Sequence, residues 1–389
     1  MARPEFSHPV LRMMGIPRLR VPSRNWSIFW ALTAGIGGGV WYDRRERRRV
    51  RQEWKDKVAH LANAPISALE LPRKVTVYVA PPPNDYLDVS LKHFRDYIKP
   101  ILTAAAVDYE LIEETQQGTI RYNVAESIRN ERREAAGHPT SGYQKDDLDH
   151  KIDSRVARDL TGGVLCVGRG AYKEYLSGLQ EGYMGPLEEP EFVKEEIERR
   201  KAAALAKAEE EKAKAEPAPE AKPAADNASE PAADEKPVDT IESASATEET
   251  AEKKAQDKEP RVPSWLRAEH YDEAKVDDLF FSAKLEPIGV FRHPHLLGFL
   301  NTPWRIVRYF NQRKLANEMG ELTAAVVFNQ TRPFTPQDID LALSDEQDWP
   351  NSWKQNGRDA NSEWMRELKV DPRIMPRLEV YDPKAPRPK

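Results

Sequence analysis

The sequence predicts an α/β protein: a single N-terminal transmembrane helix followed by a mostly parallel α/β sandwich interrupted by a long disordered insertion. Three observations predict this class. Residues 25–42 contain no charged side chain, residues 73–186 alternate strand-like and helix-like patterns, and residues 201–260 contain almost no large apolar side chain. The net charge of −5 and the single cysteine indicate neither a nucleic-acid-binding surface nor a disulfide-bonded secreted domain.

The uncharged run at residues 25–42 has the length and the flanking side chains of a membrane-spanning helix. Eighteen helical residues rise about 27 Å, close to the ~30 Å hydrocarbon core of a bilayer. Aromatic rings at both ends, with arginines beyond them, match the side chains that anchor such helices at the two membrane interfaces. The predicted anchors are Arg24, Trp26, Trp30, Trp41, Tyr42, Arg44 and Arg45.

Two other interpretations of this run fit less well. A secretory signal peptide would be followed by small residues at a cleavage site, but an arginine cluster follows here. A buried helix of a soluble domain would not carry arginines against both ends. Ala31, Gly35 and Gly39 recur every four residues, which predicts close packing against another membrane helix, although glycine is common in membrane helices in general.

Residues 43–64 are predicted to continue as a juxtamembrane helix. Val50, Trp54, Val58 and Leu61 give this helix one narrow apolar stripe among charged residues. The stripe fits either an anionic membrane surface or the soluble domain, and we favour the second.

The first part of the α/β domain, residues 65–192, is predicted from alternating strand and helix patterns. Strands are expected at residues 73–80, 107–112 and 163–167. Helices are expected over residues 87–102 with a division at Pro100, from Thr119 to about residue 137, around residues 148–156, and from about Ala171. Connections of this length between strands favour parallel pairing.

Residues 193–262 are predicted to be a charged helix and a disordered linker, because they cannot bury enough apolar surface to offset the entropy of folding. The second part of the α/β domain, residues 263–335, is expected to contain a helix at residues 303–319 and a buried strand at residues 322–328 that joins the sheet. The last segment, residues 336–389, is rich in tryptophan and proline, and we expect an irregular tail.

No pattern in the sequence predicts a catalytic residue, a cofactor site or a metal site. Gly168-Arg169-Gly170 follows a predicted strand but lacks the rest of a phosphate-binding motif, and three prolines follow the first strand where backbone N–H groups would be needed. His293 and His295 have no neighbouring ligand that would complete a metal site, and we interpret them as part of a rigid turn. Cys166 is interpreted as a buried core residue.

Several short strings in the sequence carry a family resemblance. They are Pro9-Val10-Leu11, Met14-Gly15-Ile16-Pro17 and Pro22-Ser23-Arg24-Asn25-Trp26 before the predicted helix, and Gly289-Val290-Phe291, His293-Pro294-His295 and Gly298-Phe299-Leu300-Asn301-Thr302-Pro303 after the linker. Together with the order of basic segment, single helix and large soluble part, these strings resemble the family of subunit fifty-four of the mitochondrial inner-membrane carrier translocase of fungi.

The resemblance implies a non-enzymatic scaffold subunit of the mitochondrial inner membrane that needs no cofactor and binds no nucleic acid. It implies a role in inserting multispanning carrier proteins that small intermembrane-space chaperones deliver. The implied partners are the pore and other translocase subunits, those chaperones, the incoming carriers, inner-membrane lipid and the intermembrane-space AAA protease. The candidate docking segment for a partner contains His293, His295, Phe299, Leu300, Asn301 and Trp304.

The family's orientation places residues 1–24 in the matrix and the large domain in the intermembrane space. Counting Lys and Arg on the two sides of the run favours the opposite orientation, but the difference is small and both flanks are basic, so we follow the family. The alternative function is a membrane-anchored α/β enzyme that acts on a nucleotide or a lipid, which the α/β pattern and the turn at Gly168 to Gly170 favour.

Overall fold

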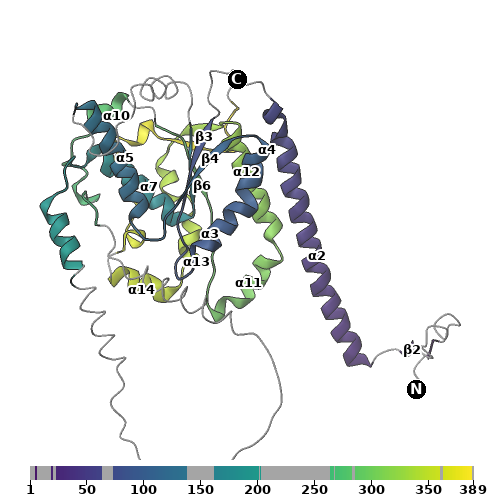
Figure 1. The fold of residues 1–389 in the computed structure, drawn as a ribbon. Coiled ribbons are helices and arrows are strands. Elements are labelled where there is room, and N and C mark those ends of the chain that lie inside the picture. The colour runs from purple at the N-terminus through teal and green to yellow at the C-terminus, as the bar shows by residue number, and fades with distance from the viewer. Residues whose placement is uncertain are drawn as a thin grey trace, which may run out of the picture.

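Alternating apolar side chains build the central sheet of this protein, whose structure is a computed structural model (Figure 1). The structure describes residues 5–6, 19–20, 23–63, 73–137, 162–200, 202, 263–266, 268–282, 285–359 and 362–387. Within these ranges six strands form one sheet in the order β4-β3-β5-β6-β8-β7. The strands are β3 (Lys74–Val79), β4 (Asp108–Glu113), β5 (Val164–Val167), β6 (Ile288–Phe291), β7 (Thr331–Pro333) and β8 (Glu379–Tyr381).

The sheet confirms the predicted α/β class and its mostly parallel pairing. β3, β4, β5, β6 and β8 run parallel, and β7 pairs antiparallel with β8. β1 (Glu5–Phe6) and β2 (Leu19–Arg20) form a separate antiparallel pair. The sheet is buried on both faces, since Val75, Val77 and Val79 of β3 enter one apolar core and Tyr78 packs against the other. Burial of both faces is typical of parallel sheets.

One layer over the sheet consists of α5 (Thr119–Ala135), α7 (Arg169–Met184) and the C-terminal tail (Figure 1). Glycines let the two helices approach closely, since a Cβ on Gly178 would lie 2.6 Å from the carbonyl oxygen of Arg121. The tail was expected to be irregular, but it contains β8 and several short helical elements. These elements are η5 (Pro336–Asp340), α13 (Leu343–Asp348), α14 (Asn351–Asp359), η6 (Glu363–Met365) and η7 (Met375–Arg377).

The opposite layer consists of α3 (Leu87–His93), the π-helical turn η2 (Phe94–Ile98), α4 (Lys99–Ala104), α12 (Gln312–Val327) and the second half of α2 (Arg24–Val58), as Figure 1 shows. Pro100 lies in the first turn of α4, directly after the π-helical turn. The predicted division of this helix at Pro100 is therefore confirmed, because proline supplies no N–H to the preceding turn.

α2 is joined to α12 by an apolar contact and by a capping carboxylate. The Trp54 ring covers Gly320, and its Nε1 donates to Asn317 Oδ1 at 3.1 Å. The buried Asp43 carboxylate accepts the backbone N–H of Arg313, in the first turn of α12, at 3.3 Å. The apolar stripe of residues 50–61 thus packs on the α/β domain, as favoured from the sequence.

The transmembrane helix predicted at residues 25–42 is wrong. In the described part of the chain, no helix combines the length and the apolar character needed to cross a membrane. The predicted run is the first half of α2, and its glycines, Asn25 and Ser27 dilute its apolar character. Its last residues are also partly covered by protein, because Gly39 meets the Phe310 ring and Arg313 lies over the Tyr42 ring at 5.3 Å. The single-pass topology that depended on this helix is corrected with it.

The strand predicted at residues 322–328 is also wrong, because these residues end α12. The helix predicted at residues 303–319 is divided between α11 (Thr302–Tyr309) and α12. The misleading run is apolar on several sides because it lies against the sheet, and a short buried helix then has no clear periodicity. The chain after the insertion joins the sheet through β6, which pairs parallel with β5.

Other predictions lie wholly or partly outside the described residues. The helix predicted at residues 148–156 and most of residues 1–24 lie outside them. Of the charged helix and linker predicted at residues 193–262, the first residues belong to a helix at residues 191–200, and residues 203–262 lie outside the described part. The remaining short elements are η1 (Ala59–Asn63), η3 (Ala268–His270), α10 (Asp278–Ser282) and η4 (Phe299–Asn301).

Replacing Gly320 by Val should separate α2 from α12, because a Cβ at this position overlaps the Trp54 ring. We expect a loss of roughly 1–3 kcal/mol in the free energy of unfolding, measured by chemical denaturation. Amide hydrogen exchange of residues 43–58 should become faster. Gly37→Val is the matched control, since nothing lies within 4 Å of a Cβ there. Equal effects of the two substitutions on residues 43–58 would contradict this packing.

Candidate functional site

The topology of the sheet marks one place where a ligand would be expected. The chain leaves β3 toward β4 on one side, whereas β5 and β6 extend the sheet on the other side. In open α/β sheets, ligands bind at such a switch point, at the carboxyl ends of the strands. Here this place lies between Pro81 to Pro83, after β3, and Gly168 to Gly170, after β5.

The C-terminal tail fills this crevice. The cavity that remains has a volume of about 20 Å³, which is room for about one water molecule and far too little for a nucleotide. A Cβ on Gly170 would lie 2.5 Å from Cζ2 of Trp364, so the indole sits directly on the start of α7. Trp349 and Trp353 pack around Trp364 with ring centroids 5.9 and 6.0 Å away. The nucleotide site that would support an enzyme is therefore occupied by the protein's own side chains.

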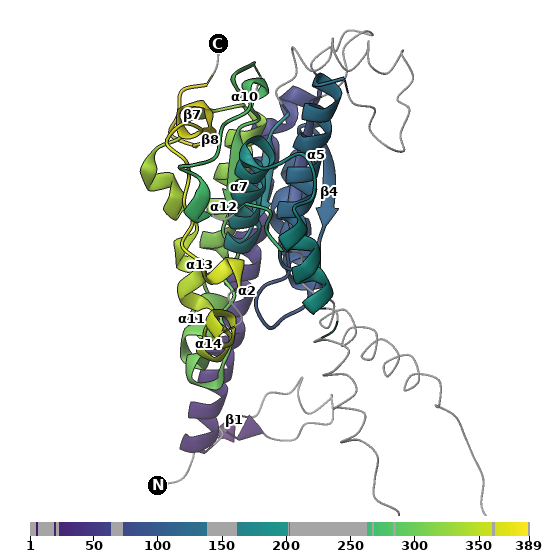
Figure 2. The ribbon, with the colours of Figure 1, turned by 90° about the vertical axis from the view of Figure 1, so that its left-hand side faces the viewer.

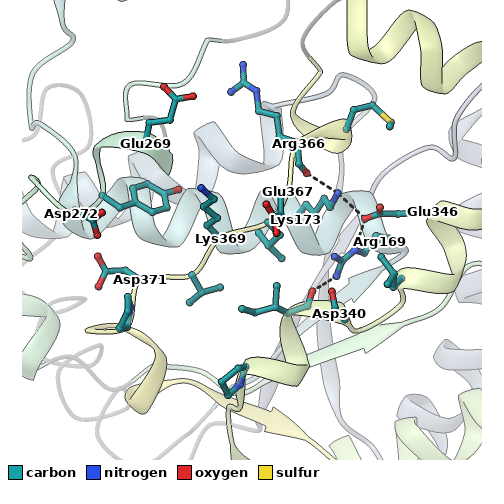
Figure 3. A pocket seen from close by; sticks show the side chains of 18 residues that line it. Arg169, Lys173, Glu269, Asp272, Asp340, Glu346, Arg366, Glu367, Lys369 and Asp371 are labelled. Carbon is teal, nitrogen blue, oxygen red and sulfur yellow. Dashed lines mark hydrogen bonds and ion pairs between the residues drawn. The ribbon is translucent and has the colours of Figure 1, made fainter.

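Two buried cations of α7 hold the tail in place (Figure 3). Arg169 donates to Glu346 at 2.8 Å and to the carbonyl oxygens of Ile339 and Leu341 at 2.5 and 2.8 Å. Lys173 donates to the carbonyl oxygen of Trp364 at 2.7 Å and lies 2.7 Å from Glu346. Both cations are thereby used within the fold, so neither is available for a phosphate.

The pKa values of this cluster follow from burial and pairing. Burial lowers the pKa of Lys173, and the hydrogen bond with Glu346 offsets only part of this effect. Burial alone would raise the pKa of Glu346, but hydrogen bonds from Arg169 and Lys173 outweigh it and lower the pKa. The lowered pKa of Glu346 keeps its carboxylate ionised beneath the tail at neutral pH.

A second buried cluster joins α5, α7 and the tail. Glu181 is fully buried and accepts from Arg121 at 2.5 Å and from Arg129 at 2.6 Å. Arg121 also pairs with Glu363 of η6 at 3.0 Å, and the Arg129 guanidinium lies 3.6 Å above the Trp265 ring. The chain on both sides of α5 and α7 is thus held together by buried ion pairs, which indicates a rigid platform.

Sequence reasoning missed these buried charges. A detectable signal was that Arg121 and Arg129 stand at helix spacing from Val124, Ala125 and Ile128, on the side of α5 that had to face the core. Above the first cluster, a polar groove of about 770 Å³ runs between the tail, η3 and η5. Its floor consists of Arg169, Lys173 and Glu346, whose bonds are described above (Figure 3).

Of the two histidines of the predicted docking segment, His293 is buried and His295 is half-buried, so they offer little surface for docking. His93, His293 and His295 lie in a row, with ring centroids 4.9 and 6.0 Å apart. The backbone N–H of His293 donates to Asp345 Oδ2 at 2.8 Å, and His295 Nε2 lies 3.3 Å from Asp85 Oδ2. Among the described residues, no group of three His, Cys, Asp or Glu side chains is placed to hold a metal ion.

The rest of the predicted docking segment is open. Phe299 and Leu300 are each 89% exposed and Trp304 is 66% exposed, although none of them is polar. Asn301 is half-buried and donates to the Leu297 carbonyl oxygen at 2.7 Å. The structure therefore separates the predicted segment into a histidine pair packed within the fold and an exposed apolar surface.

The predicted interface anchors and the small-residue stripe lie on the first half of α2. Tyr42 contacts Arg313 of the α/β domain, whereas the other six anchor side chains lie free of it. All seven anchors are exposed: Arg24, Trp26, Trp30, Trp41, Tyr42, Arg44 and Arg45. Arg45 lies over the Trp41 ring at 5.4 Å. Within the stripe, Ala31 is exposed and a Cβ on Gly35 would meet nothing within 4 Å, but Gly39 already packs on Phe310. Only the first two stripe positions are therefore free for a partner.

Comparison with known proteins gives a consistent result. The model of the family described as inner membrane protein import complex subunit Tim54 matches residues 8–381. The chain is 38% identical to the mitochondrial import inner membrane translocase subunit TIM54 of Candida albicans, over 97% of each chain. It is 34% identical to the protein of that name from Yarrowia lipolytica and 31% identical to that from Saccharomyces cerevisiae, in both cases over 98% of this chain and 95% of the relative.

Replacing Trp364 by Ala should open the crevice and destabilise the fold. The substitution removes a buried indole that also donates to Glu174 at 2.5 Å, so we expect a loss of roughly 3–5 kcal/mol in the free energy of unfolding. Trp304→Ala is the control and should change this quantity by less than about 0.5 kcal/mol, because Trp304 is exposed. Chemical denaturation measures both values. A similarly small loss in the free energy of unfolding for both variants would contradict the conclusion that Trp364 fills the crevice.

The buried histidines should make the protein less stable in acid. Burial lowers the pKa of His93 to about 3, and that of His293 to about 4. In the unfolded chain His93 binds a proton below pH ~6.5, whereas in the folded protein it stays neutral. The folded state therefore loses about 1 kcal/mol of stability through this residue between pH ~7.5 and ~5.5. Thermal unfolding of His93→Gln should show a smaller loss over this interval than the parent protein.

Other groups do not obscure this comparison. Burial raises the pKa of Asp345 to about 6 and that of Glu174 to about 7. Folded carboxyls with raised pKa values bind protons before the unfolded chain does, so they favour the folded state in acid, in both proteins alike. Parallel stability curves for His93→Gln and the parent would contradict the assignment.

Proposed function

The chain belongs to the Tim54 family of inner membrane protein import complex subunits, and on this basis we propose that it is a non-enzymatic scaffold of the mitochondrial import translocase. In this proposal it stabilises the complex and offers a docking surface to small intermembrane-space chaperones while carrier proteins are inserted. Its α/β domain then faces the intermembrane space. Its partners are the pore and other translocase subunits, those chaperones and the carriers, with the intermembrane-space AAA protease as a further partner.

The filled crevice is the observation that carries the scaffold proposal. An α/β enzyme of this topology needs a crevice at the carboxyl ends of β3 and β5, and here Trp364 and its neighbours occupy that place. A sheet sealed by its own tail is well suited to support other proteins without changing shape. The same observation speaks against the alternative function, an enzyme acting on a nucleotide or a lipid.

We also propose that the open part of the small-residue stripe, Ala31 and Gly35, packs against a helix of another translocase subunit. Both positions are exposed on α2, and a helix partner could approach closely there because neither side chain extends far. This contact leaves the buried clusters of the α/β domain untouched.

Affinity purification of the tagged full chain in mild detergent tests this function. We expect the other translocase subunits and the small chaperones to be recovered with it, and Gly35→Leu should reduce the recovery of subunits several-fold. Gly37→Leu is a matched control, because it places the same side chain on the same exposed helix but on another face. Recovery of the parent chain without any translocase subunit would refute the scaffold role, and equal recovery with both variants would refute the stripe contact.

A further inference from the structure

The exposed surface of η4 and α11 has the character of a helix that lies on a membrane. Every residue of α11 is exposed, and its side chains divide into an apolar and a polar side. Leu300, Trp304 and Val307 follow one another at helical spacing, and Arg305 falls on the opposite side. We call the apolar side the α11 face, which consists of Phe299, Leu300, Trp304, Ile306 and Val307; each of these side chains is at least half exposed.

The α11 face lies beside another exposed apolar surface. Phe310, which follows α11, contacts Gly39 of α2, so α11 is held next to the first half of that helix. Figure 1 and Figure 2 both show α11 at the end of the molecule toward which this half of α2 projects. Trp30 and Ile36 of α2 are exposed there as well. The two surfaces together are apolar over a length that isolated surface side chains do not explain.

Two exposed arginines lie next to the place where the two surfaces meet. Arg44 and Arg45 directly follow the contact at Asp43. The carboxylates of this region are engaged, since Asp348 pairs with Arg308 at 2.6 and 2.9 Å and Asp43 lies 3.6 Å from Arg313. The rim of the apolar surface is therefore basic.

We infer that the α11 face lies in the headgroup region of an anionic bilayer, with its apolar side chains toward the acyl chains and the neighbouring arginines at lipid phosphates. An amphipathic helix with large apolar side chains and a basic rim binds such surfaces through apolar burial and electrostatic attraction. A protein groove fits less well, because Phe299 and Leu300 protrude almost completely from the fold. This inference rests on the proposed function only for the placement of the chain at the inner membrane.

The single cysteine of the chain makes a site-specific test simple. Cys166 is fully buried and burial raises the pKa of its thiol, so an introduced surface cysteine can be labelled alone. The full chain carrying Leu300→Cys or Arg305→Cys is labelled with an environment-sensitive fluorophore. Each protein is titrated with vesicles of phosphatidylcholine alone and of phosphatidylcholine with cardiolipin.

We expect the label at position 300 to brighten several-fold with cardiolipin vesicles, far less with neutral ones, and to be quenched by quenchers on the acyl chains. The matched label at position 305 should stay in water. Adding Trp304→Ser to the Leu300→Cys protein should weaken the vesicle titration about tenfold, because one large apolar side chain no longer enters the lipid.

Two results would overturn the inference. One is an unchanged label at position 300 while the chain floats with the vesicles, which would mean that another segment binds lipid. The other is a response at position 300 only after translocase subunits or chaperones are added, which would assign the face to a protein partner. Recovery of translocase subunits by the labelled protein tests the proposed function separately, so the failure of one can be told from the failure of the other.

Discussion

The fold depends on two charges that are buried beneath the C-terminal tail. Arg169 and Lys173 lose nearly all contact with water, and such a loss is tolerable only when every donor finds a partner. Glu346 and four main-chain carbonyls of the tail supply those partners. The tail is therefore a structural part of the domain, although it arrives last in the sequence, and its position decides what the sheet can and cannot bind.

The same topology is common among enzymes, so the fold by itself says little about function. What distinguishes this chain is how the switch point of the sheet is used. Three tryptophans of the tail occupy the space that a cofactor would take, and the buried pairs of Glu181 fix the helices behind it. The exposed apolar side chains of α11 and of the first half of α2 lie at one end of the molecule, where we expect contacts with other components.

The sequence allowed the first half of the sheet to be predicted but not the second. β3 alternates apolar and polar residues and β5 is entirely apolar, and both were predicted because such patterns last for several residues. β6 is as long as β5 but contains Gly289 and follows a proline, and β8 has only three residues, so neither shows a clear strand pattern. The apolar end of α12, in turn, resembles a strand when its surroundings are unknown. The run at residues 25–42 was wrongly predicted to cross a membrane because it contains no charge, although its glycines make it only weakly apolar. The crevice could not be predicted, because Trp364 and Gly170 are distant in sequence.

The carboxylate of Asp43 has a consequence for how the protein responds to its surroundings. α12 takes the cap of its first turn from Asp43, a residue within α2, and not from its own Asn311, so the N-terminus of α12 depends on the position of α2. A tilt of α2 would withdraw the cap and leave backbone donors unmatched, at a cost of about 1 kcal/mol. Because α12 packs against the sheet, any tilt of the long helix α2 would be transmitted through α12 to the core of the domain.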